Sequence, residues 1–251
     1  MPSPDAKQAI RVQVWNALEA ASATHTPVHG RIPTFKGAEA AAELLAAHPA
    51  YQRARVIKAV PDWAQHPVRT RALADGKTVY MAVPKLATPK PFRHLDPTQL
   101  PLPPHEAATS STAVRIGRPV DVDEMPPIDA VVLGSVAVNR NGARIGKGAG
   151  YSDLEWALLS EAGLVTPHTL VVTTVHALQV IDDPIPTSAH DLHVDLIVTP
   201  TQTLTCDGPP RPTGIHWELL TAGQIEAIPA LRERASKRPG IRRSPRRRSA
   251  G

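Results

Sequence analysis

The chain has 251 residues, of which 42% are hydrophobic and 20% charged, and it contains 27 prolines and one cysteine. This length and composition suit one large globular domain or a domain with tails, and the single Cys206 excludes an internal disulfide. The formal net charge is +5, but residues 232–248 carry nine Arg or Lys and one Glu, so the remainder has a net charge of −3. The basic character therefore belongs to the C-terminal tail, and the body gives no support for a nucleic-acid-binding surface.

The first residues and the hydropathy pattern indicate where the protein is found. Residues 1–5 lack a charged start followed by an apolar segment, so no signal peptide is expected. No apolar run approaches the roughly 18 residues that a membrane-spanning helix needs. The single cysteine fits a reducing compartment. Together these features predict a cytoplasmic protein without a membrane span.

A helix is predicted over residues 4–21, with Ser3 as its cap and Pro4 in the first helical position. Four apolar residues fall on one face at helical spacing: Ile10, Val14, Trp15 and Leu18. Lys7 and Arg11 lie one turn apart and project from one side of this helix. On spacing alone, such a pair is typical of a solvated charged face.

Alternating strands and helices are predicted along the rest of the body. Strands are expected at residues 54–60, 77–83, 128–138, 169–175 and 196–198, and helices at 38–47, 66–74, 153–160 and 222–234. Residues 84–104 hold seven prolines and should contain little regular structure, and residues 113–120 are expected to be irregular. This alternation predicts an α/β domain over residues 1–234 with a mostly parallel sheet covered by helices on both faces. The basic residues 235–251 are expected to be a disordered tail.

A polar loop follows the strand predicted at residues 54–60 and contains Asp62 and Trp63. Ligands of open α/β sheets bind outside the carboxyl ends of the strands, so this loop is a candidate for ligand contact. The indole of Trp63 either stacks on a planar heterocycle or is buried in the core, and the sequence leaves both roles open.

Residues 144–153 are the most informative stretch, because three glycines alternate with other residues between a predicted strand and a predicted helix. Gly146, Gly148 and Gly150 remove side chains where a backbone could touch a ligand, and their amides can form an anion nest at the start of the helix. A flexible glycine turn is the alternative, since such motifs have a known false-positive risk. The flanking charges favour a nucleotide or polyanion site, with cations for phosphate and a carboxylate for a metal ion: Arg144, Lys147 and Asp153.

This stretch resembles the signature of the 5-formyltetrahydrofolate cyclo-ligase family, Arg-Leu-Gly-x-Gly-x-Gly-Tyr-Tyr-Asp after a hydrophobic strand. Ser152 stands where the signature has its second Tyr. With the flanking runs 134–138 and 153–157, the stretch is still more similar to a divergent branch, the methenyltetrahydrofolate synthetase domain-containing proteins. The resemblance extends in patches over roughly residues 5–230.

The resemblance implies a three-layer Rossmann-like α/β fold related to the NagB, ribose-5-phosphate isomerase and CoA-transferase group. It also implies roles for particular residues. ATP contacts would come from Lys7, Arg11, Arg144, Gly146, Lys147, Gly148 and Gly150. Substrate contacts would come from Asp62, Gly148, Gly150 and Tyr151, where Asp62 replaces the Glu of the family's Glu-x-x-Thr loop and Gln65 replaces its Thr. Mg²⁺ would be associated with Asp153 and Asp195, and the catalytic residues would be Arg144, Lys147 and Tyr151.

The implied reaction is the ATP- and Mg²⁺-dependent cyclisation of 5-formyltetrahydrofolate to 5,10-methenyltetrahydrofolate, by a monomer or a homodimer. Three alternatives remain. The first is a paralogous enzyme acting on another heterocycle, such as a thiamin-related one. The second is a non-catalytic nucleotide- or RNA-binding protein that attracts nucleic acid or an acidic partner weakly through the basic tail. The third is a sugar-phosphate isomerase, which rests on fold analogy alone.

Overall fold

The computed structural model describes residues 4–238 of the chain. Ser3, the predicted cap of the first helix, and residues 239–251 of the basic tail lie outside this range. The last described helix, α9, extends to Lys237, so residues 235–237 are helical rather than part of an irregular tail.

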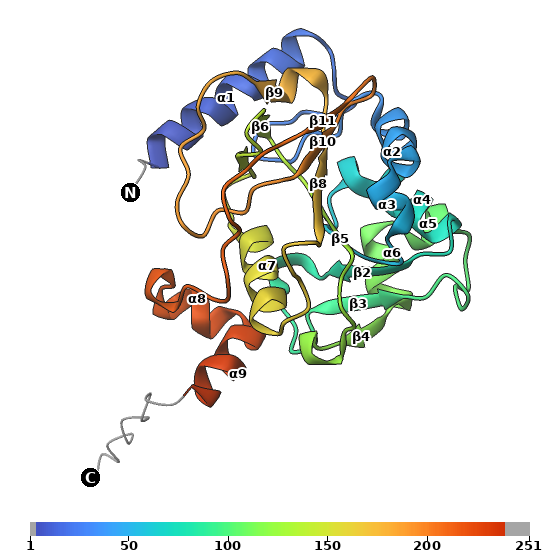
Figure 1. The fold of residues 1–251 in the computed structure, drawn as a ribbon, viewed down its shortest axis with the longest axis vertical. Coiled ribbons are helices and arrows are strands. Elements are labelled where there is room, and N and C mark those ends of the chain that lie inside the picture. Colours follow the sequence, from blue (N-terminus) through green and yellow to red (C-terminus); the bar gives the residue numbers. More distant parts are fainter. Residues whose placement is uncertain (1–3, 239–251) are drawn as a thin grey trace.

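An eight-stranded sheet forms the centre of the fold (Figure 1). In spatial order its strands are β11 (Thr203–Thr205), β10 (Leu196–Val198), β8 (Leu170–Thr174), β5 (Ala130–Leu133), β1 (Val56–Ala59), β2 (Thr78–Ala82), β3 (Phe92–Leu95) and β4 (Arg118–Val120). The five strands from β10 to β2 are parallel, whereas β11 at one edge and β3 and β4 at the other pair antiparallel. A small second sheet contains β7 (Arg144–Ile145), β6 (Ala137–Asn139) and β9 (Val180–Ile181).

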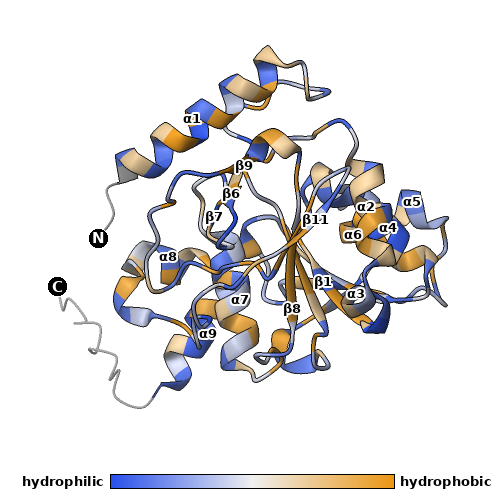
Figure 2. Ribbon diagram, turned by 45° about the horizontal axis from the view of Figure 1, so that its top comes forward, coloured by the Kyte–Doolittle hydropathy of each residue, from blue (hydrophilic) through white to orange (hydrophobic). Residues whose placement is uncertain are grey.

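Two layers of helices enclose the large sheet. The helices that precede β5 are α1 (Pro4–Ala20), α2 (Ala38–Ala47), α3 (Pro49–Arg53), α4 (His66–Ala74), α5 (Pro104–Ala107) and α6 (Ser110–Ile116). Those that follow the glycine stretch are α7 (Tyr151–Glu161), α8 (Ala222–Ala227) and α9 (Pro229–Lys237). Figure 2 shows α2, α4, α5 and α6 on one side of the sheet and α7, α8 and α9 on the other. Short 3-10 turns connect the elements: η1 (Trp63–Gln65), η2 (Pro84–Leu86), η3 (Val122–Glu124), η4 (Ala177–Gln179) and η5 (Trp217–Leu219).

Each central strand contributes to two hydrophobic cores. In β5, Ala130 and Val132 join the cluster under α2 and α4, while Val131 and Leu133 join the cluster under α7 and α9. Successive side chains of a strand point to opposite faces, so a parallel strand covered on both sides must be apolar throughout. This explains why β5 is an uninterrupted buried Ala-Val-Val-Leu run. The predicted α/β fold with a mostly parallel sheet and helices on both faces is therefore confirmed.

Several predicted elements differ from those observed. The strand expected at residues 128–138 is divided at Gly134 into β5 and β6, which belong to different sheets. The helix expected at residues 222–234 is divided into α8 and α9, because Ile228 is extended before Pro229 (φ −110°, ψ 105°), a conformation that proline imposes on its predecessor. Strand β11 follows β10, which was expected to be the last.

Two regions expected to be irregular contain regular structure. Residues 84–104 contain β3, and residues 113–120 contain most of α6 and all of β4. The start of α6 could have been predicted from the sequence, because Thr is a preferred N-cap residue. In the structure the Thr109 side chain accepts a hydrogen bond from the backbone N–H of Thr112. Pro119 lies within β4, which is possible because β4 is an edge strand. No helix among residues 4–238 is both long and apolar enough to cross a membrane.

Candidate functional site

A large cavity lies at the carboxyl edge of the parallel strands. Asp62 follows β1, Pro84 follows β2 and Gly134 follows β5, and all three line it. Its volume is about 1120 Å³. Since pockets of roughly 300–1,000 Å³ hold one small molecule, this cavity has room for a nucleotide and a second ligand. Its position is the one at which open α/β sheets bind their ligands.

The glycine stretch crosses this cavity between β7 and α7. Gly148 and Gly150 have positive φ values of 103° and 69°, which L-residues rarely adopt, so the path of the chain requires glycine at both positions. A Cβ atom on Gly148 would lie 3.5 Å from the guanidinium carbon of Arg11, so the loop backbone passes close beneath this side chain. Gly150 immediately precedes α7, which places the first turn of the helix, beginning at Tyr151, at the cavity.

The four predicted phosphate-binding cations converge on the cavity. Lys7 and Arg11 reach it from α1, although α1 is more than 120 residues away from the glycine stretch in the sequence. Arg144 and Lys147 reach it from β7 and from the glycine stretch itself. Arg11 Nε donates a hydrogen bond to the carbonyl of Gly146 (2.8 Å), which joins α1 directly to the loop. Partial burial lowers the pKa of Arg11, but a guanidinium stays charged at neutral pH.

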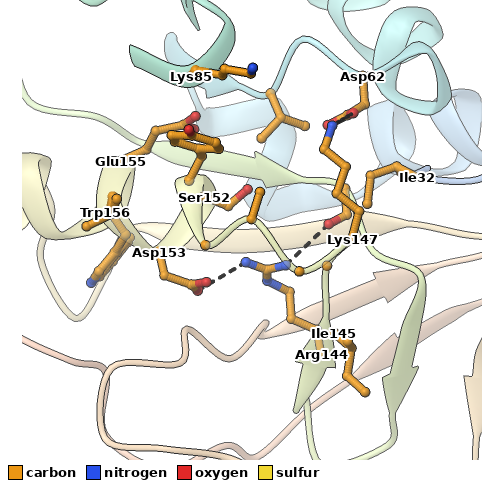
Figure 3. Close-up of a pocket in the computed structure, with 18 of the residues that line it drawn as sticks. Ile32, Asp62, Lys85, Arg144, Ile145, Lys147, Ser152, Asp153, Glu155 and Trp156 are labelled. Carbon is orange, nitrogen blue, oxygen red and sulfur yellow. Dashed lines mark hydrogen bonds and ion pairs between the residues drawn. The ribbon is translucent and has the colours of Figure 1, made fainter. Parts of the chain in front are cut away.

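Three of these cations form ion pairs across the cavity. Lys7 Nζ lies 2.7 Å from Asp191 Oδ2, and Lys147 Nζ lies 3.1 Å from Asp62 Oδ1. Arg144 Nη2 lies 3.1 Å from Asp153 Oδ1, and Figure 3 shows this pair beside the one between Lys147 and Asp62. The cations are therefore positioned by carboxylates that an anionic ligand would have to displace or share.

The network also affects the acidity of one carboxyl group. Burial acts to raise the pKa of Asp191, but the hydrogen bonds from Lys7 and from the backbone N–H of Ser188 outweigh it, so the pKa lies below its usual value. Asp191 is therefore ionised at neutral pH and holds Lys7 in place.

Arg144 has a buried nitrogen without a partner. The residue is only 6% exposed, and its Nη1 atom donates to the carbonyl of Gly134 (3.3 Å). Within residues 4–238, its Nε atom has no hydrogen-bond partner. Buried polar groups are nearly always hydrogen-bonded, so this unpaired N–H of a residue that lines the cavity is unusual. The guanidinium group suits phosphate binding, and Arg144 is one of the residues that line the cavity.

The loop that carries Asp62 is fixed from behind by Arg69 of α4. The Arg69 side chain is buried and donates hydrogen bonds to the carbonyls of Val60 (2.6 Å), Asp62 (3.0 Å) and Ala108 (2.9 Å). Burial lowers the pKa of Arg69 to about 10. These bonds satisfy loop carbonyls that would otherwise be buried without partners, so they set the direction in which Asp62 and Trp63 point.

Trp63 and Gln65 of this loop take opposite positions. The Trp63 side chain is 61% exposed and lines the cavity, which excludes the core role that the sequence left open. Gln65 is fully buried, and its Nε2 atom donates to the carbonyl of Thr174 (3.2 Å). Gln65 therefore connects the loop to β8 beneath the cavity.

Asp195 is not part of the cavity. It immediately precedes β10, so it lies at the amino end of a parallel strand, whereas the cavity lies at the carboxyl ends. Its Oδ2 atom accepts a hydrogen bond from the backbone N–H of Val171 (2.7 Å) and pairs with Arg211. Of the two carboxylates that the resemblance associates with Mg²⁺, the structure places Asp153 at the cavity and Asp195 away from it.

Sequence reasoning missed four charged residues that line the cavity, Arg31, Lys85, Glu155 and Asp191, and one that lies behind it, Lys58. Lys85 and the following Leu86 have positive φ values of 60° and 50°, a strained conformation for non-glycine residues. Lys58 could have been found from the sequence, because a charged residue is unusual in an apolar strand that is covered on both faces. It pairs with Glu155 of α7, and burial raises the pKa of Glu155 while Lys58 acts in the opposite direction.

Fold and site together define an α/β protein with a ligand cavity at the carboxyl edge of its parallel strands, bordered by a cationic glycine loop. The sequence model of the 5-formyltetrahydrofolate cyclo-ligase family matches residues 3–200, and the chain belongs to this family. A methenyltetrahydrofolate synthase domain-containing protein of Bos taurus is 40% identical over 258 residues, which cover 96% of this chain and 66% of that protein. A protein of the same name from Homo sapiens is 38% identical over 237 residues, covering 90% and 60% respectively. The chain thus spans less than two thirds of the length of these relatives.

The fold is also similar to a solved structure. The 5,10-methenyltetrahydrofolate synthetase of Aquifex aeolicus superposes with a TM-score of 0.52 at 17% sequence identity, covering 88% of this chain and all of that one. At this level of identity the similarity supports the three-layer α/β fold.

Proposed function

We propose that this protein catalyses the ATP- and Mg²⁺-dependent cyclisation of 5-formyltetrahydrofolate to 5,10-methenyltetrahydrofolate, or a closely related ATP-dependent ring closure. The observation that carries the proposal is the convergence of Lys7, Arg11, Arg144 and Lys147 with a three-glycine loop on one cavity large enough for two ligands. Membership of the cyclo-ligase family supports the same reaction class.

The cations would bind the phosphates of ATP. Arg144 lines the cavity with its guanidinium group, and the glycine loop offers backbone amides at the N-terminal end of α7. Lys7 and Lys147 are held beside this loop by Asp191 and Asp62. Phosphoryl transfer depends mainly on alignment and charge neutralisation, and a positioned set of cations supplies both.

Asp153 fits the role of the Mg²⁺-associated carboxylate. Mg²⁺ in nucleotide sites uses one or two carboxylates and takes its remaining ligands from phosphate oxygens and water. Among the described residues no group of three or more potential metal-ligating side chains occurs, which agrees with such a sparse site. Bound there, the ion would supply charge neutralisation at the phosphates. Asp153 accepts hydrogen bonds from Arg144 and from the backbone N–H of Leu192 (3.2 Å), which fix its direction.

The second ligand would bind between the glycine loop and the loop after β1. In the reaction, the formyl oxygen attacks the terminal phosphorus of ATP and ADP leaves. The neighbouring nitrogen of the substrate then attacks the formyl carbon and loses its proton, and the ring closes as phosphate leaves with the former formyl oxygen. Tyr151 and Trp63 border the space with aromatic rings, and Asp62 contributes a carboxylate at its edge. The protein residues act by orienting the two ligands and excluding water, and no protein nucleophile is required.

A second candidate function is an ATP-dependent reaction on another heterocycle, such as a thiamin-related one. Two observations favour it. Asp62, at the position of the family's folate-contacting Glu, is engaged by Lys147, and Gln65, at the position of the Thr, is buried beneath the loop. These are changes in the substrate half of the cavity, whereas the phosphate half keeps all four cations.

The test is to mix the purified protein with MgATP and 5-formyltetrahydrofolate and to follow the near-ultraviolet absorbance of the methenyl product. The Lys147→Ala variant should lose product formation. Lys90→Ala is the matched control, because Lys90 is a surface lysine that pairs with Glu124. Product formation by wild type supports cyclisation of this folate. Binding of MgATP without product supports the second candidate, and absence of both contradicts an ATP-dependent function.

A further inference from the structure

A buried ion pair joins the central sheet to α7 beside the cavity. Lys58 of β1 is fully buried, and its ammonium group pairs with the carboxylate of Glu155, which is 4% exposed. The residues next to Lys58 across the sheet are Tyr80 of β2 and Val131 of β5. Neither of these carries a negative charge, so Glu155 is the group that neutralises Lys58.

Stability alone does not account for the Lys58–Glu155 pair. Removing two charges from water has a large desolvation cost, and replacing a buried ion pair by apolar residues of similar volume is often neutral or stabilising. Central parallel strands are ordinarily apolar on both faces. A buried ionised group that borders a cavity is instead a candidate functional group.

Glu155 borders the cavity, whereas Lys58 lies behind it. Glu155 is one of the cavity-lining residues, and Figure 3 shows its side chain turned from α7 toward the side of the cavity from which Lys85 projects. Lys58 contacts the Oε2 atom of Glu155. In the part of the chain that the structure describes, this is the one hydrogen bond of the Glu155 side chain, so Oε1 has acceptor capacity left for a ligand.

The other acidic side chains of the cavity have different partners. Asp62, Asp153 and Asp191 pair with Lys147, Arg144 and Lys7, all of which are cations that the proposed function assigns to phosphate. The partner of Glu155 is a lysine that does not reach the cavity and cannot bind phosphate there. Glu155 is thus the one of these four acidic side chains whose cationic partner is not assigned to phosphate.

The backbone at the end of β2, where Lys85 lines the same cavity, is strained. Lys85 and Leu86, at the end of β2, have positive φ values although neither is glycine. Strain of this kind clusters at ligand-binding sites, where the surrounding structure maintains it. This strained backbone and the buried Lys58–Glu155 pair are therefore two independent signs of a binding function in one cavity.

We propose that Glu155, held by Lys58, is the hydrogen-bond acceptor that selects the second ligand, and that this ligand is a neutral planar heterocycle with an amino group beside a ring N–H. Lys58 already neutralises the carboxylate, so the ligand needs N–H donors rather than a positive charge. An anionic or carbonyl edge at this position would be repelled by the carboxylate. The inference deepens the proposed function, on which it rests for the assignment of this cavity to a heterocyclic substrate.

The test compares two probes that differ at one position of the ring. Pterin carries an amino group at C2, whereas lumazine carries an oxo group there, and their binding to the full chain is measured by calorimetry without ATP. Wild type should bind pterin at least about tenfold more tightly than lumazine, because a site that hydrogen-bonds an N–H rejects an analogue that lacks it. Equal affinities, or no binding of either probe, would overturn the inference.

Two variants separate recognition from folding. The double variant Lys58→Met/Glu155→Leu should melt at the same or a higher temperature than wild type but bind both probes equally. Glu155→Gln keeps the side-chain shape and should also reduce the preference. Glu161→Gln is the control, because Glu161 lies on the same helix but pairs with Arg234 at the surface. This variant should keep the preference for pterin over lumazine. A preference that survives in the double variant or in full in Glu155→Gln overturns the inference.

These measurements are independent of turnover. If wild type prefers pterin but forms no methenyl product, the proposed cyclisation fails and the role of Glu155 stands. If product forms without any preference between the probes, the role of Glu155 alone fails.

Discussion

Lys147 of the glycine loop and Asp62 of the loop after β1 form an ion pair of 3.1 Å across the cavity. The pair joins the half of the site that we assign to phosphate with the half that we assign to the second ligand. Its side chains are 45% and 20% exposed, so solvent weakens it and its strength is modest. A phosphate group can therefore compete with Asp62 for Lys147.

Replacing Asp62 by Asn should tighten MgATP binding by about two- to fivefold, because Lys147 no longer has to leave a carboxylate and partly exposed pairs are worth up to about 1 kcal/mol. Lys147→Ala should weaken MgATP binding at least about tenfold, since it removes a charge-assisted contact. Isothermal titration of both variants measures this. Weaker binding in the Asp62→Asn variant would contradict the competition between Asp62 and phosphate.

Asp153→Ala and Asp195→Ala should differ in their effect on nucleotide binding. The first should abolish the Mg²⁺ dependence of nucleotide binding, and it should also destabilise the protein because it leaves the buried Arg144 and the N–H of Leu192 without their acceptor. The second should leave nucleotide binding unchanged but destabilise the protein by about 1–3 kcal/mol, because it leaves the N–H of Val171 and the charge of Arg211 without their acceptor. Nucleotide titrations with and without Mg²⁺, together with thermal melts, distinguish the two. Loss of the Mg²⁺ dependence in the Asp195→Ala variant would return this residue to the metal site.

Gly148→Ala should lower both stability and nucleotide affinity. Its φ of 103° is strained for alanine, and the new methyl group would face Arg11. Gly163→Ala is the matched control, because Gly163 also has a positive φ (71°) but has no atoms within 4 Å of the added Cβ. Each variant should lose about 1–2 kcal/mol of stability. Only Gly148→Ala should weaken MgATP binding, and an equal loss in Gly163→Ala would mean that the affinity reports global stability.

Cys206 should react slowly with alkylating reagents in the native protein. Burial raises its pKa to about 11 from a model-peptide value of 9.0, and Asp195 and Asp207 add to this shift. The folded state therefore holds the thiol proton more tightly than the unfolded state. This contribution to stability is complete below about pH 9 and is lost as the pH rises through about 11. The slow reaction is tested by labelling native and denatured protein with iodoacetamide at pH 8. Equal labelling rates would contradict the burial of the thiol.

The sequence predicted the strands and helices whose patterns are local. The apolar runs of β1, β2, β5, β8 and β10 and the helical spacing of α1 and α2 are strong signals, because burial on two faces or on one stripe dictates residue type directly. Edge strands carry weaker constraints. Strand β4 contains Pro119, and β11 is mostly exposed, so neither has a pattern that distinguishes it from a loop.

The sequence predicted the site residues that lie close together in the chain. It did not predict which charged side chains form ion pairs with each other. A single stretch, residues 144–153, contains the glycine loop with Arg144, Lys147 and Asp153. The structure places Lys7 and Arg11 at the same cavity, a connection that came only from the family resemblance. Whether these residues bind ATP stays a prediction. The partners of each charge depend on side-chain geometry across distant segments, as with Lys58 and Glu155, which are 97 residues apart.

The most direct measurement of the central claim is a crystal structure of the full chain with Mg²⁺ and a non-hydrolysable ATP analogue. The account predicts phosphate oxygens within hydrogen-bonding distance of the Arg144 guanidinium and Lys147 Nζ, with Lys147 released from Asp62 and Mg²⁺ next to Asp153. A nucleotide bound outside this cavity, or bound within it while the pair between Lys147 and Asp62 stays closed, would contradict the account.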